Sequence, residues 1–133
     1  LKKVYGKKFS PEAMGIEIVS SDDRFTQKFY EVVEKHLNDP DLSIDTVSKE
    51  MGLSRANFYR KLKEISDLRP IDLIRNKRLE VAAKLLATSD YTVSEIANFT
   101  GFNSHSYFTT CFTKVYGYSP SEWVQKHKIE KGG

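Results

Sequence analysis

The sequence of 133 residues has little cysteine and no long hydrophobic run. Its only cysteine, Cys111, excludes an internal disulfide and a zinc site built from several thiolates. No segment approaches the roughly 18 uninterrupted apolar residues that a membrane span requires, and residues 1–8 lack the apolar stretch of a signal peptide. We therefore expect a soluble, cytoplasmic chain without membrane contact, in a compartment where cysteine stays reduced.

Motifs of catalysis and of metal binding are also missing. The sequence contains no glycine-rich phosphate loop, nucleophile elbow or pair of catalytic carboxylates. His36, His105 and His127 have no Cys or carboxylate partners at ligand spacing, and Cys111 beside Phe112 is expected to be a buried thiol. We expect no enzymatic activity, no cofactor and no metal in this chain.

Net charge is small, at +3, but it is unevenly distributed. Residues 1–8 carry +4, residues 9–53 carry −6, residues 54–84 carry +5, and residues 85–133 are neutral. The basic block 54–84 could be a solvated helix surface or could face a polyanion, and charge alone does not choose between them. Its bases are Arg55, Arg60, Lys61, Lys63, Arg69, Arg75, Lys77, Arg78 and Lys84.

Apolar residues recur at helical spacing from Phe25 onward, which predicts an all-α fold. The first helix should open after the acidic Ser21-Asp22-Asp23, and a long fourth helix should begin near Pro70 and span roughly 19 residues, about 28 Å. The apolar positions of the first four helices are Phe25, Phe29, Val32, Val33 and Leu37; Ile44, Val47 and Met51; Phe58, Leu62 and Ile65; and Ile71, Ile74, Leu79, Ala82, Ala83, Leu85 and Leu86.

The pattern of a short helix, a glycine-containing turn and a second helix occurs twice. A capping box, Thr92 to Glu95, and a cap at Ser104 should begin the two helices of the second copy. Two copies joined by the long helix predict two helix-turn-helix units. At an offset of 49, Ile44, Val47 and Gly52 match Val93, Ile96 and Gly101; at 50, Ser54, Phe58, Leu62, Ile65, Pro70 and Leu73 match Ser104, Phe108, Phe112, Val115, Pro120 and Trp123.

A helix-turn-helix buries one face of its second helix and leaves the N-terminal half free to enter a DNA major groove, about 12 Å wide. We expect Val115 to face inward with Phe108 and Phe112, and Tyr107, Phe102 and Trp123 to be core residues. The expected exposed positions are Arg55, Ala56, Tyr59, Arg60 and Lys63 in the first copy, and His105, Ser106, Thr109 and Thr110 in the second. A helical protein-interaction module with a basic face, or nonspecific DNA packaging, remain as alternatives.

Several segments resemble the signature of AraC-type (AraC/XylS family) transcription regulators. The resemblance covers roughly residues 25–126 and is strongest in Gly101-Phe102-Asn103-Ser104-His105-Ser106-Tyr107-Phe108 and in Tyr116-Gly117-Tyr118-Ser119-Pro120. Segments 42–44, 51–55, 59–63 and 74–79 look like the form found at the C-terminus of hybrid two-component regulators of Bacteroides-like bacteria. The resemblance implies seven helices in two subdomains, 21–69 and 90–128, joined by a linker helix at 70–89, with 1–20 as an upstream linker and 129–133 as a tail.

The partners that this resemblance implies are double-stranded DNA at a promoter or operator and upstream receiver and sensor domains of a longer parent protein. Dimerisation of the parent is expected. Contact with RNA polymerase, a histidine kinase elsewhere in the parent and an anchor in the inner membrane are all compatible with the resemblance.

Carried over residue by residue, the resemblance assigns roles to both second helices. Ala56, Tyr59 and Arg60 would read bases, with Ser54 and Arg55 near phosphate; in the second copy the assigned residues are Ser104, His105, Ser106, Thr109 and Thr110. Arg60 could bind guanine in two places or could pair with Glu64, and Tyr59 could touch a base or lie on the helix surface against the linker.

Two departures from the family pattern matter. Relatives often carry a basic residue at the position of Thr110, so we expect weaker base contacts from the second unit. Relatives usually carry glycine at the position of Asp67, so the resemblance does not fix the shape of that helix end. We expect the first unit to supply most of the electrostatic attraction and the second a weaker, hydrogen-bonding readout.

Overall fold

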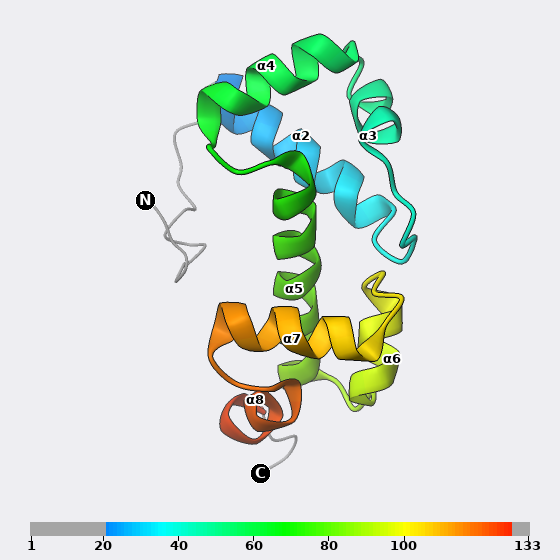
Figure 1. Ribbon diagram of the computed structural model, residues 1–133, viewed down its shortest axis with the longest axis vertical. Helices are drawn as coiled ribbons and strands as arrows, with labels where there is room; N and C mark the ends of the chain where they lie inside the picture. The colour runs from blue at the N-terminus through cyan, green and yellow to red at the C-terminus, as the bar shows by residue number, and fades with distance from the viewer. Residues whose placement is uncertain (1–20, 129–133) are drawn as a thin grey trace.

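A computed structural model describes residues 21–128, which form seven α-helices and no strand (Figure 1). The all-α prediction is confirmed. The predicted linker at 1–20 and tail at 129–133 lie outside the described residues. Within 21–128, no helix combines the length and the apolar character that crossing a bilayer requires. The helices are α2 (Ser21–Lys35), α3 (Ile44–Glu50), α4 (Arg55–Ile65), α5 (Pro70–Thr88), α6 (Val93–Phe99), α7 (His105–Tyr116) and α8 (Pro120–His127).

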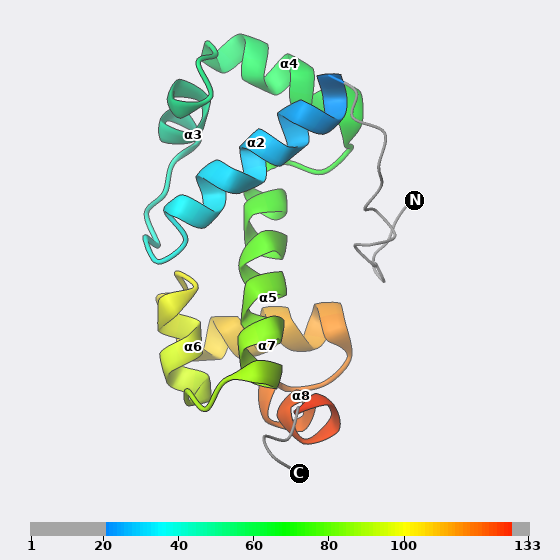
Figure 2. The same cartoon turned by 180° about the vertical axis from the view of Figure 1, so that it is seen from behind.

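The long helix α5 is the axis of the molecule. Figures 1 and 2 show α2, α3 and α4 around one end of α5 and α6, α7 and α8 around the other. We call these groups, each with the adjoining half of α5, the first and the second lobe. Helix α5 has apolar residues on more than one side because its N-terminal half packs on α2 and its C-terminal half on α6 and α8.

Each lobe has its own aromatic core. In the first, the Phe58 ring lies 6.0 Å from that of Phe25 and 5.9 Å from that of Phe29, measured between centroids. In the second, the Phe108 ring lies 5.0 Å from that of Phe102 and 5.7 Å from that of Phe112. The first core contains Phe25, Phe29, Val32, Val33, Val47, Phe58, Leu62 and Ile74, and the second contains Leu79, Ala82, Ala83, Leu86, Ile96, Ala97, Phe102, Phe108 and Phe112.

Three core expectations for the second copy need correction. Val115 is 47% exposed, because the inward row of α7 continues from Phe112 to Tyr116, four residues on. Tyr116 packs between Phe112 and Trp123, with ring centroids 4.7 and 4.8 Å away. Tyr107 is 51% exposed, since it precedes the buried Phe108 and lies off the apolar stripe. Cys111 is half-buried rather than buried.

The first and fourth helices also differ in detail from expectation. Helix α2 begins at Ser21, so the acidic residues form its first turn instead of preceding it. Leu37 lies in the turn beyond α2 and is half-buried against the first core. Ile71 is 60% exposed, whereas Ile74 on the same helix is buried.

The two second helices end in different ways. Gly117 follows α7 with a left-handed backbone at φ +81°, the usual glycine-dependent helix end. Its counterpart, Asp67, cannot do the same at low cost, and no non-glycine residue in 21–128 has positive φ. Helix α4 instead ends at an extended Ser66, whose Oγ accepts a hydrogen bond from the Leu68 N–H at 3.0 Å. Because Asp67 stands where the second copy has Gly117, α4 ends with a different backbone conformation from α7.

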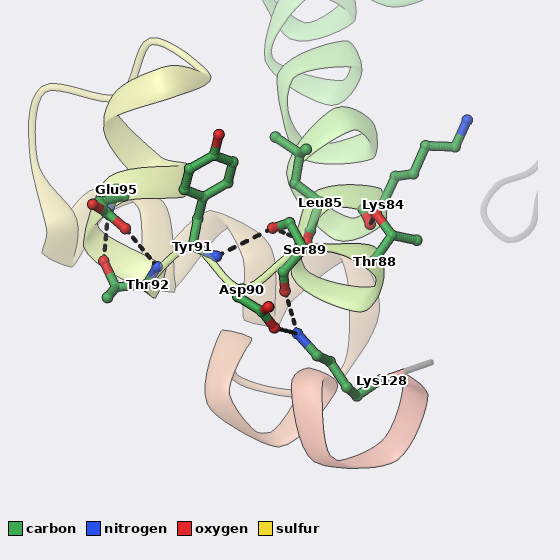
Figure 3. A network of polar contacts seen from close by, with 9 residues as sticks. All are labelled: Lys84, Leu85, Thr88, Ser89, Asp90, Tyr91, Thr92, Glu95 and Lys128. Carbon is green, nitrogen blue, oxygen red and sulfur yellow. Dashed lines mark hydrogen bonds and ion pairs between the residues drawn. The ribbon is translucent and has the colours of Figure 1, made fainter. Parts of the chain in front are cut away.

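Polar contacts fix the junction between α5 and α6 (Figure 3). The Thr92 N–H donates to Glu95 Oε1 at 2.9 Å and the Glu95 N–H donates to Thr92 Oγ1 at 3.0 Å, which confirms the capping box. From beyond α8, Lys128 Nζ donates to the Ser89 carbonyl and lies 3.2 Å from Asp90 Oδ1. The segment that leads into the second helix-turn-helix is therefore fixed by the capping box of α6 and by Lys128, which follows α8.

We predict that Thr92→Ala lowers the free energy of unfolding by about 1 kcal/mol, because it removes the acceptor for the Glu95 N–H. Urea denaturation followed by circular dichroism measures this. Ser94→Ala, an exposed substitution in the same helix, is the matched control and should stay within about 0.5 kcal/mol of wild type. Equal effects of the two substitutions would contradict the role of the box.

Candidate nucleic-acid interface

The first helix-turn-helix consists of α3, a short turn and α4. Ser43 caps α3 by accepting from the Thr46 N–H, and Ser54 caps α4 by accepting from the Asn57 N–H, both at 3.1 Å. Between them Gly52 adopts φ +75°, and the Leu53 N–H donates to the Ser48 carbonyl at 3.0 Å. These contacts turn the chain sharply and leave the N-terminal half of α4 directed outward.

The second unit, α6 to α7, repeats the geometry. Gly101 adopts φ +85°, and the Phe102 N–H donates to the Ala97 carbonyl at 2.9 Å. That bond joins the counterparts of Ser48 and Leu53, at the same offset of 49 that the sequence repeat shows. Ser104 then caps α7 by accepting from the Tyr107 N–H at 3.1 Å.

Helices α4 and α7 lie on the same face of the molecule. In Figure 1, α4 passes in front of α2 and α7 passes in front of α5, and in Figure 2 both orders are reversed. Both helices run across the direction of α5. The structure therefore brings the two helices that carry the predicted residue sets to one face, at opposite ends of α5.

Most of the predicted residues are exposed. On α4 and its cap these are Ser54, Arg55, Ala56, Tyr59, Arg60 and Lys63, and on α7 and its cap they are Ser104, His105, Ser106 and Thr110. Thr109 is the exception, being half-buried next to Phe108. A shallow depression on α4 is lined by Tyr59, Arg60, Lys63 and Glu64.

The arginines of α4 have carboxylate partners in the unbound domain. Arg60 Nη1 lies 3.3 Å from Glu64 Oε2, and Arg55 Nη1 lies 3.0 Å from Asp45 Oδ1 on α3. The arginine side chains are 61–65% exposed, so solvent screens each pair and the carboxylate can be exchanged for another anion. Tyr59 is 39% exposed, with its ring edge-on to Phe58 and 5.8 Å from the Arg55 guanidinium.

Pairing reduces the free charge of the whole basic block. Arg69 and Arg75 both contact Asp72, at 2.9 and 3.0 Å, and the hydrogen bond from Arg69 lowers the pKa of that carboxyl. Lys77 lies 2.9 Å from Glu34 on α2 and 3.0 Å from Glu80. Lys63 is exposed, and it makes no ion pair within residues 21–128. Most of the basic residues of block 54–84 therefore have a carboxylate partner in the unbound domain.

Sequence reasoning missed two exposed residues at equivalent positions. Asn57 and Tyr107 are the third residues of α4 and α7, and both are exposed on the outer face. The repeat offset of 50 relates them and could have identified the pair. Asn57 Oδ1 lies 3.4 Å from Arg60 Nη2, so it helps to orient that guanidinium. Across residues 21–128 there is no cluster of His, Cys, Asp and Glu that could hold a metal ion.

Comparison with known proteins identifies the family. The helix-turn-helix domain family matches residues 47–126, which include both turns and both outward helices. The chain belongs to the AraC-type helix-turn-helix family. The domain is the DNA-binding domain of an AraC-family transcription regulator.

Curated relatives of this AraC-family chain are much longer than it is. Histidine kinase P4 of Formosa agariphila is 31% identical over 112 residues, 84% of this chain and 8% of that protein. The MmsAB operon regulatory protein of Pseudomonas aeruginosa is 30% identical over 92 residues, 69% of this chain and 30% of that protein. The chain thus spans less than a third of either relative.

Solved structures share the arrangement of the two lobes. The C-terminal domain of AraT, a response regulator from Geobacillus stearothermophilus, superposes with a TM-score of 0.72 and 26% identity over 86% of this chain and 94% of that one. The DNA-binding domain of AdpA, solved in complex with a target DNA, superposes with a TM-score of 0.66 and 26% sequence identity. The match covers 75% of this chain and 89% of that one.

One ion pair positions the first helix-turn-helix against α2. The Glu50 carboxylate at the end of α3 lies 2.6 Å from His36 Nε2 and 3.3 Å from Lys35 Nζ. The hydrogen bond with His36 is the largest cause that lowers the pKa of Glu50. A carboxyl with a lowered pKa in the folded state stabilises the fold above its ordinary pKa, and the contribution is lost as pH falls through the folded-state value.

We therefore predict that the stability difference between wild type and Glu50→Gln is largest above about pH 5 and shrinks as the pH falls towards 2. Urea denaturation at several pH values measures the difference. Glu31→Gln on α2 is the matched control for removing one exposed negative charge. A difference that stays constant with pH would show that the charge of Glu50 contributes nothing.

Proposed function

We propose that the domain binds double-stranded DNA in a sequence-specific way, with α4 and α7 in successive major grooves. The observation that carries this is the pair of helices with matching turns on one face, each with a polar, exposed N-terminal half. An α-helix fits the major groove, and its N-terminal N–H groups favour phosphate nearby. The AdpA domain, which superposes on this chain and was solved with a target DNA, supports the proposal.

Each helix has a distinct proposed task. On α4, Arg60, Ala56 and Tyr59 read bases, while Ser54, Arg55 and Lys63 contact phosphate. On α7, readout relies on hydrogen bonds from polar residues of the helix and its cap and is weaker, because Thr110 supplies no charge. These residues are Ser104, His105, Ser106, Thr109 and Thr110.

Arg60 must exchange partners to read a base. It is held by Glu64 and Asn57 in the unbound domain, and the weak, exposed ion pair is easily replaced by the two acceptors of guanine. Binding would then break the Arg60–Glu64 contact. Only a site with a correctly placed guanine would replace it with new hydrogen bonds to Arg60. The pairing thus favours specific over nonspecific binding.

We further propose that the domain is the output end of a longer two-component regulator that acts in the cytoplasm. AraT, whose C-terminal domain superposes over most of this chain, is a response regulator, and the Formosa relative is named a histidine kinase. Receiver and sensor domains upstream, dimerisation of the parent and contact with RNA polymerase belong to this proposal. So do a histidine kinase and an inner-membrane anchor in the parent.

A titration at several salt concentrations tests DNA binding directly. Against promoter DNA, roughly six neutralised phosphates should give a slope near −5 of log affinity on log salt. Scrambled DNA of equal length is the control and should bind more weakly. Equal affinity for both would indicate nonspecific packaging, and absence of salt-dependent binding would leave the protein-interaction module as the function.

Substitutions on α4 separate base reading from phosphate contact. We predict that Arg60→Ala reduces discrimination at one base pair by about 1–3 kcal/mol, while Arg55→Ala weakens binding to all sequences nearly equally. Affinities for a set of single-base operator variants measure both. Equal losses by both variants on every sequence would show that Arg60 reads no base.

A further inference from the structure

The two lobes meet at a buried arginine in the middle of α5. Arg78 is only 6% exposed, and its guanidinium donates hydrogen bonds to three backbone carbonyls. Nη1 donates to Leu37 O and, at 2.8 Å, to Thr100 O; Nη2 donates to Asp39 O at 2.8 Å. Leu37 and Asp39 belong to the turn after α2, and Thr100 ends α6. One side chain therefore holds the first lobe, the second lobe and the helix between them.

The neighbouring glycine shows how closely the lobes approach. A Cβ at Gly101 would overlap the Arg78 guanidinium and the Leu37 carbonyl oxygen, whereas a Cβ at its counterpart Gly52 would meet nothing within 4 Å. Both glycines have positive φ, so backbone conformation alone does not distinguish them. The difference is that the α6–α7 turn is pressed against the turn after α2. Figures 1 and 2 both show these two turns side by side along one flank of α5.

Within the described part of the chain, the neighbouring polar contacts of α5 do not bridge the lobes in this way. Lys77, the preceding residue, binds Glu34 of α2 and Glu80 of α5 itself. Arg75, one turn earlier, pairs with Asp72 on the same helix. A buried guanidinium that donates to fixed carbonyls is costly to separate from them, because each buried donor left unpaired loses its hydrogen bond without regaining water.

We propose that Arg78 is a positioning residue that fixes α4 relative to α7 and so makes the domain select DNA by the spacing of its two recognised segments. This inference rests on the proposed DNA binding. Inserting one base pair between the segments rotates one against the other by about 35°, since a helical turn takes 10–10.5 base pairs. Lobes that are locked together cannot follow that rotation, whereas lobes joined by α5 alone can bend towards it.

A spacing series tests the proposal. Wild-type protein first selects its preferred site from random DNA, and the segment between the two contacted grooves is then shortened or lengthened by one and two base pairs. Wild type should lose about tenfold or more in affinity per inserted or deleted base pair, the range of a mismatched site. Arg78→Met should bind the best site less tightly but lose less than about threefold on changing the spacing.

Matched variants separate positioning from stability. Arg78→Lys keeps the charge with a single ammonium group, and should give intermediate spacing discrimination. Arg75→Met removes a cation from the same helix and should keep the discrimination of wild type. If Arg78→Met is not folded by circular dichroism, Arg78→Lys decides alone. Spacing profiles of Arg78→Lys that coincide with wild type would overturn the proposal.

A second measurement does not require DNA. Spin labels on cysteines at the exposed positions Gln27 on α2 and Ser121 on α8, in a Cys111→Ala background, report the distance between lobes. Arg78→Met or Arg78→Lys should broaden the distance distribution, and Arg75→Met should not. An unchanged distribution in the Arg78 variants overturns the positioning role. Absence of sequence-specific binding by wild type would refute the proposed function instead, because the distance measurement stands without it.

Discussion

A charged guanidinium buried in the middle of α5 is the constraint on which the arrangement of this molecule depends. Burial lowers the pKa of Arg78, which reflects the cost of holding its charge away from water. No carboxylate among the described residues hydrogen-bonds to it, so backbone carbonyls of two distant turns must satisfy its donors. The turn after α2 and the end of α6 both lie against this guanidinium, and a side chain at Gly101 would overlap it.

Around this point the fold is built from two similar units that are not identical. Both turns use a left-handed glycine and the same backbone hydrogen bond, and both outward helices begin at a serine cap. They diverge at their C-terminal ends, where Gly117 has its counterpart in Asp67 and where Tyr116 extends the aromatic core of the second lobe towards Trp123. The two copies therefore share the turns and caps that position the outward helices. They differ in the helix ends and in the aromatic residues that pack behind these helices.

Local signals in the sequence predicted most of the fold. The predicted caps at Thr92 and Ser104 are confirmed because each needs only residues within one turn of helix. Val115 and Tyr107 were placed wrongly because the repeat was assumed to extend to the helix end and because aromatic residues were assumed to be core. Both Val115 and Tyr116 are within one turn of Phe112, and it is the contact of Tyr116 with Trp123 on α8 that decides between them, which no local signal reveals.

The exposure of the candidate interface residues was predictable from the sequence, whereas their pairing with carboxylates was not. The turn and the cap define which residues of α4 and α7 face outward, and the exposure of the predicted set agrees, with Thr109 as the exception. Charge counted along the chain misses partners that come from other helices, such as Asp45 for Arg55 and Glu34 for Lys77. The role of Arg78 depends on carbonyls about 40 and 22 residues away, which no spacing rule reaches.

The ion pairs on α4 bear on how such a domain would search a chromosome. Asp45 and Glu64 act as built-in counterions for Arg55 and Arg60, so the protein brings part of its own charge neutralisation to any DNA it meets. The time that a protein stays on nonspecific DNA depends on how many counterions it releases from the phosphates. This time is shorter when fewer counterions are displaced. A regulator made this way would leave wrong sequences quickly, and its speed in finding a site would come from frequent dissociation rather than from a strong general attraction to DNA.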